Sequence, residues 1–282
     1  MKLTYSSTEV ERWRDKTYRR TEKLVVKNGR QALAFINSVG FCLASRSDGV
    51  ELPNLWDAIT SNTELPLKAD RNYYLSYASE LQNILPNHNS VYYGKVFKRR
   101  PSIVSREYFP YFYALSERSG LTDEYETEFS KGKLSAIAKK IMDVLMKNAP
   151  LTAKEIRIAA AEKGNTGSEG FAKALDELQR KMFLCRVVGN GHQLGTEWAP
   201  VVKCFPAEVR RARRISMDEA RCKLLEKYFQ NQLISSIESI HKVFAWSKQE
   251  IYHAIGNLMH SGIIMTTAPP DVKRRKCYCL IH

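Results

Sequence analysis

The hydrophobic positions between residues 132 and 205 follow a helical period and then change to the pattern of strands. Ile137, Ile141 and Leu145 recur at helical spacing in the first segment. Thr152 followed by Glu155 is the pattern of a capping box at the start of a second helix. The expected elements are helices over Leu134–Lys147, Ala153–Glu162 and about 169–182, followed by a hairpin of Leu184–Val188 and Glu197–Lys203.

The same order of elements returns between residues 206 and 282. Ser247 is placed to cap a helix that Gly262 ends. The expected elements are helices over Met217–Gln230, Ser235–Phe244 and Lys248–His260, followed by a hairpin of Ile263–Thr267 and Lys276–Ile281. Three helices and a β-hairpin are the layout of a winged helix, a variant of the helix-turn-helix. The pattern predicts two winged-helix modules, at 132–205 and 206–282, which share architecture more than residues.

The first 118 residues have a less regular pattern. A basic helix is expected over about 7–27, within an N-terminal region of residues 1–28. The region 29–118 is expected to be mixed and helix-dominated, and the acidic stretch 119–131 to be a linker. Region 29–118 is expected to begin with a helix that ends at Gly40 and a strand at Phe41–Ala44. The elements expected after them are helices over Leu52–Thr60, Tyr73–Leu85 and Tyr92–Phe97, a strand at Ile103–Val104 and a helix over Arg106–Leu115. The predicted fold class is therefore α+β, helix-dominated, with tandem winged-helix modules.

Composition and charge narrow the classes of partner that the protein could bind. The 282 residues include 44 Lys and Arg against 30 Asp and Glu, which gives a formal net charge of +14. Such a charge favours nucleic acid or an acidic surface as the partner. No stretch approaches the roughly 18 apolar residues of a membrane span, and the first residues lack the apolar core of a secretory signal. We therefore expect no membrane partner and a cytoplasmic location, with the six cysteines as free thiols.

Common enzyme motifs are absent. The sequence has no P-loop, no GxGxxG after a strand and no GxSxG. Cys277, Cys279 and His282 do not match a common zinc spacing, so Cys277 and Cys279 are interpreted as small buried residues of a strand. We expect neither a metal nor a cofactor.

The modules suggest which side chains contact DNA. The last helix of a helix-turn-helix enters the major groove, and the wing and nearby basic clusters contact phosphates. The second expected module also offers Gln179 on its last helix. The candidate DNA-binding residues are Lys95, Lys98, Arg99, Arg100, Lys173, Arg180, Lys181, Arg210, Arg211, Arg213, Arg214, Ser247, Lys248, Gln249, Tyr252, His253, Lys273, Arg274, Arg275 and Lys276. The alternative is that these charges form solvated faces and that the modules bind protein.

Three segments in the first 118 residues carry a family resemblance. They read ALAFINSVGFCLASRSDGVELPNLWDAI at 32–59, YYGKVFKRRPSIVS at 92–105 and YFPYFYAL at 108–115. Together they resemble the AlkZ/YcaQ-like winged-helix DNA glycosylase superfamily, in particular its shorter AlkZ-related branch. The resemblance implies three tandem winged-helix modules around a DNA-binding channel, with 29–118 as the first. It also implies double-stranded DNA, including damaged DNA, as the partner.

The glycosylases of this superfamily carry a Gln-x-Gln or Gln-x-Asp motif that positions the water for cleavage of an N-glycosidic bond. The alignment places that motif on Phe35, Ile36 and Asn37. Phe35 cannot hydrogen-bond a water, and the amide of Asn37 cannot act as a base. Asn37 is the candidate catalytic residue if Asp48, Glu51 or Asp57 supplies the base. The alternative is that Asn37 only hydrogen-bonds the helix end near Gly40.

Three hypotheses follow from the sequence. The first is a DNA-binding protein related to repair glycosylases that hydrolyses the bond between deoxyribose and an alkylated base. The second is a non-catalytic DNA-binding or transcription-regulatory protein, which the replaced motif favours. The third is a protein-interaction module, which requires basic clusters that are dispersed over the surface.

Overall fold

One order of elements occurs three times along the chain. The computed structural model describes residues 4–61, 75–81, 85, 90–161, 168–188, 196–269 and 276–281. Each repeat contains a helix, a short strand, two helical segments and then two strands that pair as a hairpin. In each repeat the first strand pairs antiparallel with the last, so the last strand lies in the middle of a three-stranded sheet. We refer to these repeats as the first, second and third units.

The first unit is built around the sheet β1-β3-β2. Its elements are α2 (Gly29–Val39), β1 (Phe41–Leu43), α3 (Leu55–Thr60), the helical residues 75–81, β2 (Val91–Phe97) and β3 (Arg100–Ser105). Two segments precede it, α1 (Ser7–Thr17) and the 3-10 turn η1 (Glu22–Leu24), and α5 (Phe109–Ala114) follows it. The mixed region expected at 29–118 therefore contains the same order of strands as the other two units.

The second and third units match the expected elements closely. The second contains α7 (Ala136–Asn148), β4 (Leu151–Thr152), α8 (Ala153–Ala161), α9 (Ser168–Arg180), β5 (Leu184–Val188) and β6 (Thr196–Pro200). The third contains α12 (Met217–Gln232), β7 (Ile234–Ser236), α13 (Ile237–Phe244), α14 (Lys248–His260), β8 (Ile264–Thr267) and β9 (Cys277–Leu280). The short helices α10 (Val201–Cys204) and α11 (Pro206–Ala212) connect them. The expected cap is present, because the backbone N–H of Glu250 donates to Ser247 Oγ at 3.2 Å.

Several expected elements differ from the structure. Residues 201–203, expected as strand, belong to helix α10, and Ser235 and Ser236, expected in a helix, belong to strand β7. Tyr92–Phe97 belongs to strand β2 rather than to a helix, and Tyr92 and Tyr93 are both buried. Burial on both faces removes the alternation that identifies a strand in sequence. The basic helix ends at Thr17 instead of continuing to residue 27, and Arg19 follows with a left-handed φ of 59°. The expected linker 119–131 contains helix α6 (Glu124–Ser130), whose Tyr125 is buried in the core of the second unit.

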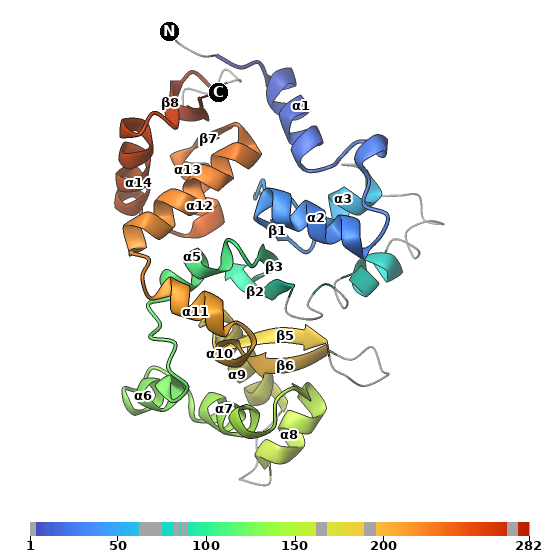
Figure 1. Ribbon diagram of the computed structural model, residues 1–282, viewed down its shortest axis with the longest axis vertical. Helices are drawn as coiled ribbons and strands as arrows, with labels where there is room; N and C mark the ends of the chain where they lie inside the picture. The colour runs from blue at the N-terminus through green and yellow to red at the C-terminus, as the bar shows by residue number, and fades with distance from the viewer. Residues whose placement is uncertain are drawn as a thin grey trace.

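The three units pack into one body. Figure 1 shows the second unit at one end of the molecule, and the first and third units side by side at the other, where both chain ends also lie. Phe41 of the first unit is fully buried, and its ring centroid lies 6.1 Å from that of Phe244 in the third unit. Helix α5 packs against both α11 and α12. Strand β2 packs against β5 and α9, which joins the first unit to the second.

Acid is expected to weaken the joint between the first and second units. Lys95 Nζ on β2 lies 2.5 Å from Asp176 Oδ1 on α9, and this hydrogen bond holds the pKa of Asp176 below its ordinary value. A carboxylate with a lowered pKa contributes stability that is present above its unfolded-state pKa and is lost as the pH falls through the folded one. As the pH falls below about 4, the free energy of unfolding of Asp176→Asn should therefore decrease less than that of the wild type.

Urea unfolding of both proteins between about pH 3 and pH 6 measures this difference. Glu169→Gln is the matched control, since Glu169 pairs with Lys173 on the exposed face of the same helix at 2.7 Å. If Glu169→Gln changed the pH dependence as much as Asp176→Asn, the Lys95–Asp176 pair would have no special role at the joint.

Candidate nucleic-acid interface

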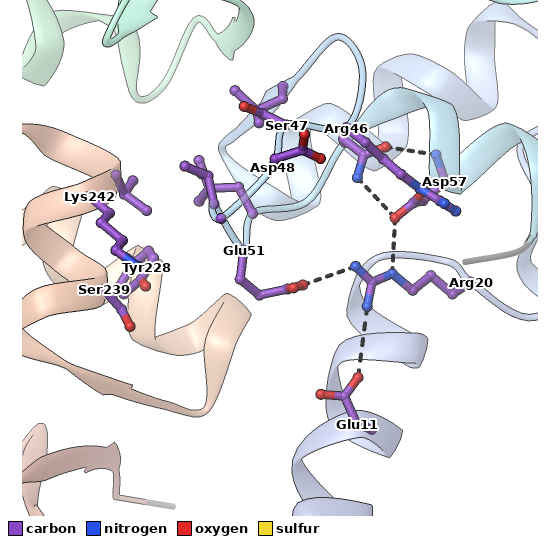
Figure 2. Close-up of a pocket in the computed structure, with 16 residues that line it drawn as sticks. Glu11, Arg20, Arg46, Ser47, Asp48, Glu51, Asp57, Tyr228, Ser239 and Lys242 are labelled. Carbon is purple, nitrogen blue, oxygen red and sulfur yellow. Dashed lines mark hydrogen bonds and ion pairs between the residues drawn. The ribbon is translucent and has the colours of Figure 1, made fainter. Parts of the chain in front are cut away.

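A cavity of about 570 Å³ lies between the first and third units. One wall is the segment from Leu43 to Asn54 that follows β1, together with Glu11 and Arg20. The opposite wall comes from α12 and α13 (Figure 2). We call this cavity the carboxylate cleft, because four acidic side chains line it. They are Glu11, Asp48, Glu51 and Asp57.

Asp57 anchors one side of the carboxylate cleft. Its side chain is 1% exposed, and its carboxylate pairs with both Arg20, at 3.1 Å, and Arg46. Asn54 Nδ2 donates to the same carboxylate at 2.9 Å. Two guanidinium groups and an amide thus occupy the oxygens of Asp57, which gives it a structural role in holding the segment after β1. A buried carboxylate needs such partners, since an unpaired charge in the interior is costly.

Glu51 is placed by Arg20 and by the third unit. Arg20 Nη2 donates to Glu51 Oε1 at 2.9 Å, and the Glu51 side chain is 43% exposed. The backbone carbonyl of Glu51 accepts from Gln232 Nε2 of α12 at 2.8 Å. Within the described residues, the second carboxylate oxygen of Glu51 has no partner. Glu51 therefore combines a fixed backbone with one oxygen that is available to a water or a ligand in the cleft.

The end of α12 fastens the first unit to the third through polar contacts. Gln232 Nε2 also donates to the buried Tyr18 hydroxyl, and Asn231 Nδ2 donates to the carbonyl of Val39 at 2.8 Å. The indole N–H of Trp13 donates to the carbonyl of Gln230 at 2.9 Å. Three successive residues of α12 thus hold α1, α2 and the segment with Glu51. These contacts fix the width of the carboxylate cleft.

Cationic side chains lie beside the carboxylate cleft. Arg100 Nε donates to Ser47 Oγ at 2.5 Å, and Ser47 lines the cleft. The ring of Phe97 lies 5.8 Å from that of Phe244 at the end of α13. These two contacts place the β2–β3 turn between the segment after β1 and α13. Lys98 and Arg99 of this turn are exposed, and Lys242 lines the opposite wall (Figure 2). Exposed cations beside a cleft are suited to hold phosphates at its entrance.

The candidate residues on α9 and nearby are largely engaged within the protein. Lys95 and Arg180 both pair with Asp176, and Lys173 pairs with Glu169. Lys181 Nζ donates to the carbonyl of Lys133. Gln179 Nε2 donates to the carbonyl of Leu175 at 3.3 Å. Because α9 also packs against β2, the second unit presents few free cations on its last helix.

The four arginines between residues 210 and 214 are all exposed, but two of them are hydrogen-bonded within the protein. Arg211 Nη2 donates to the Tyr111 hydroxyl at 3.0 Å, and Arg213 Nη2 donates to the carbonyl of Gly120 at 2.9 Å. Within the described residues, the side chains of Arg210 and Arg214 have no hydrogen-bond partner. The guanidinium groups of these two arginines are therefore free to contact a phosphate.

Helix α14 presents a free polar face. Lys248, Gln249 and Tyr252 are exposed, while Ser247 serves as the N-cap. His253 Nδ1 lies 3.3 Å from Asp218 Oδ1. In the wing, Lys276 is exposed and its Nζ lies 5.5 Å from the ring centroid of Tyr278. The other wing candidates, Lys273, Arg274 and Arg275, lie outside the described residues. None of the α14 residues lines the carboxylate cleft.

Asn37 does not lie at the cleft. It is exposed on α2, whereas its neighbours Phe35 and Ile36 are fully buried in the core of the first unit. No residue of this helix lines the cleft: the lining residues are Glu11 and Arg20 before it and those from Leu43 onward after it. Asp48, Glu51 and Asp57, the three carboxylates considered with Asn37, all line it. The cleft-lining side chains that the sequence did not single out include Arg46, Tyr228 and Lys242, because no local pattern connects them.

Three further properties of the described residues concern metal ions, cysteines and membrane spans. In the part of the chain that the structure describes, no three His, Cys, Asp or Glu side chains gather where they could hold a metal ion. None of the six cysteines, all of which lie among the described residues, forms a disulfide, and Cys277 and Cys279 are buried on β9. No helix among the described residues has the length and apolar character of a membrane span.

The repeated element order and the small antiparallel sheets define a class of helix-rich α+β proteins built from three similar units. Residues 26–245 match the family model described as AlkZ related, and the chain belongs to this family. Among solved structures, the DNA glycosylase AlkZ of Streptomyces sahachiroi is similar, with a TM-score of 0.60 and 14% sequence identity. The match covers 99% of this chain and 70% of that one, and it establishes a shared fold. A search of the curated proteins finds no match.

Proposed function

We propose that the protein binds double-stranded DNA and hydrolyses the N-glycosidic bond of an alkylated base in the carboxylate cleft. The observation that carries this proposal is the position of Glu51, with one oxygen free, in a cavity of about 570 Å³ flanked by exposed cations. Membership of the AlkZ-related family supports a role in DNA repair. In this proposal the regions 29–118, 132–205 and 206–282 are winged-helix modules, since each contains the strand order that such modules share.

The proposed reaction needs a placed water and a carboxylate. The damaged nucleotide leaves the base stack, and its base enters the cleft. The C1′–N bond breaks, and its electron pair departs with the base nitrogen. An alkylated purine that carries a positive charge leaves as a neutral base and needs no proton. The free oxygen of Glu51 accepts a proton from the water that attacks C1′, and its negative charge stabilises the developing sugar cation. The products are the free base and an abasic deoxyribose.

The cations beside the cleft should control affinity for DNA. The double variant Lys98→Asn and Arg99→Asn removes two exposed charges and keeps side chains that tolerate the positive φ of both positions. Each lost phosphate contact should reduce the slope of log K against log salt by about 0.9, without a change in sequence preference. Fluorescence anisotropy on a labelled duplex at several salt concentrations measures this slope.

The matched control removes the same charge elsewhere. Lys173→Gln with Arg180→Gln eliminates two cations that already pair with carboxylates on α9. We expect its salt slope to equal that of the wild type. If Lys98→Asn with Arg99→Asn gave the same slope of log K against log salt as the wild type, the β2–β3 turn would not contact DNA.

The second candidate function is DNA binding without catalysis. The position of Asn37 favours it, since the residue aligned with the glycosylase motif is exposed and does not line the cleft. This alternative gives the same dependence on salt as the first proposal but no release of base. A single-turnover assay for released base separates the two.

A further inference from the structure

A second cavity, also of about 570 Å³, opens beside α1, between this helix, η1 and α12. All of its charged lining residues are cationic, in contrast to the carboxylate cleft. They are Lys16, Arg19, Lys23 and Lys227. We call it the cationic cavity. The segment from α1 to Arg20 thus contributes to both cavities, with Glu11 and Arg20 in the first and Lys16 and Arg19 in the second.

The backbone explains how adjacent arginines reach different cavities. Arg19 adopts a φ of 59° immediately after α1, so the chain reverses its helical course at this residue. Arg20 then bonds the carboxylates of Asp57 and Glu51. Arg19 instead donates to the carbonyl of Gln31 at 3.4 Å, and its guanidinium lies 5.6 Å from the ring centroid of Phe35. Arg19 therefore keeps its charge in the cationic cavity without an anionic partner among the described residues.

Two lysines of the cationic cavity also lack an anionic partner among the described residues. Lys16 and Lys23 are exposed, and within the described residues neither forms an ion pair. Lys227 is half-buried, and burial lowers its pKa, while Glu107 and Glu226 act in the opposite direction. Three cations without a carboxylate partner around one hollow create a site that attracts an anion.

The remaining lining residues indicate what is attached to the anion. Trp13, Leu24 and Val25 provide apolar surface, and Leu24 is 38% exposed. The hydrogen-bonding groups nearby are mostly occupied: the indole N–H of Trp13 bonds Gln230, and the Asn231 amide N–H bonds Val39. A ligand would thus be held by charge and apolar contact more than by specific hydrogen bonds. A phosphate ester that carries a planar ring has this chemistry.

We propose that the cationic cavity is a second binding site that takes a single nucleotide unit, with its phosphate on Lys16, Arg19 and Lys23 and its base against Trp13 and Leu24. The unit is either a free nucleotide or the phosphorylated end of a strand. Because the occupied donors leave few groups to read the base, the site discriminates weakly between bases. The site is independent of the reaction proposed for the carboxylate cleft.

Calorimetric titration with deoxyadenosine monophosphate, inorganic phosphate and a 5′-phosphorylated trinucleotide tests this site. The variant Lys16→Ala with Lys23→Ala alters two exposed side chains and should fold normally. We expect it to weaken nucleotide binding by about tenfold or more, because hydrogen bonds to charged groups dominate the contact. The control variant Lys173→Gln with Arg180→Gln removes the same charge from α9, away from this cavity, and should bind the nucleotide as the wild type does.

The comparison among ligands identifies the source of the phosphate. Equal affinity for the monophosphate and the trinucleotide indicates a free nucleotide, and preference for the trinucleotide indicates a strand end. No binding of either one, binding no tighter than that of inorganic phosphate, or equal losses in both double variants would overturn the proposal. The proposal would also be overturned if Lys16→Ala with Lys23→Ala weakened binding of duplex DNA but left nucleotide binding unchanged. That result would assign these lysines to contacts with the duplex backbone.

Discussion

Glu51→Gln is expected to lower the single-turnover rate of base release by roughly 10²- to 10⁴-fold, the usual contribution of a general base. The amide keeps the size of the side chain and still accepts a hydrogen bond, but it cannot take the proton of the attacking water. Affinity for the same alkylated duplex should stay unchanged or rise, since a negative charge near the phosphates is removed. Quenched-flow cleavage of abasic sites gives the rate, and anisotropy gives the affinity.

Two other carboxylates of the cleft provide controls for this prediction. Asp48→Asn alters an exposed carboxylate in the same segment, and Glu11→Gln alters one on α1. Neither should approach the effect of Glu51→Gln, because neither combines the Arg20 contact at 2.9 Å with a backbone held by Gln232. A large loss in Asp48→Asn with normal rates in Glu51→Gln would transfer the role of base to Asp48.

Asp57→Ala is expected to destabilise the protein by about 3–5 kcal/mol, the usual cost of removing one partner of a buried ion pair. The substitution leaves Arg20, whose side chain is 9% exposed, without its buried carboxylate, and it also releases Arg46. The segment that carries Glu51 should loosen as well, so base release should fall together with stability. Urea unfolding gives the change in free energy.

Arg46→Ala is the control for this second prediction. The Arg46 side chain is 34% exposed, so water replaces more of the lost interaction, and Asp57 still pairs with Arg20. Its destabilisation should be clearly smaller than that of Asp57→Ala. Equal effects would show that burial of Asp57 does not determine the strength of this network.

The sequence was most informative where local chemistry decides the structure. Helix α14 begins and ends where Ser247 and Gly262 predicted, because a capping box and a glycine specify the ends of a helix with little help from the rest of the fold. The capping box of Thr152 and Glu155 is also present, with the Glu155 backbone N–H 3.3 Å from Thr152 Oγ1. Strand β2 was wrongly expected as a helix, since its identity depends on pairing with β3.

The candidate site was also predictable only in part, because local sequence identified its carboxylates but tertiary contacts determine their roles. Asp48, Glu51 and Asp57 were considered from the sequence as carboxylates near the resemblance, and the fold places all three in one cleft. Their different roles were not predictable. Glu51 is held by Gln232, which lies 181 positions away, and Asp57 is neutralised by two arginines that precede it in the chain by 37 and 11 positions. Tertiary contacts therefore separate a structural carboxylate from one that is free to act.

The most direct test of the central claim is the mass-spectrometric measurement of free 7-methylguanine after excess protein is mixed with a duplex that contains one N7-methylguanine. Hydrolysis in the carboxylate cleft predicts that free base appears in equal amount to abasic sites, within a single turnover and without added metal or cofactor. Tight binding of the duplex with no release above the protein-free rate would contradict it, and would identify the protein as a DNA-binding member of its family without this activity.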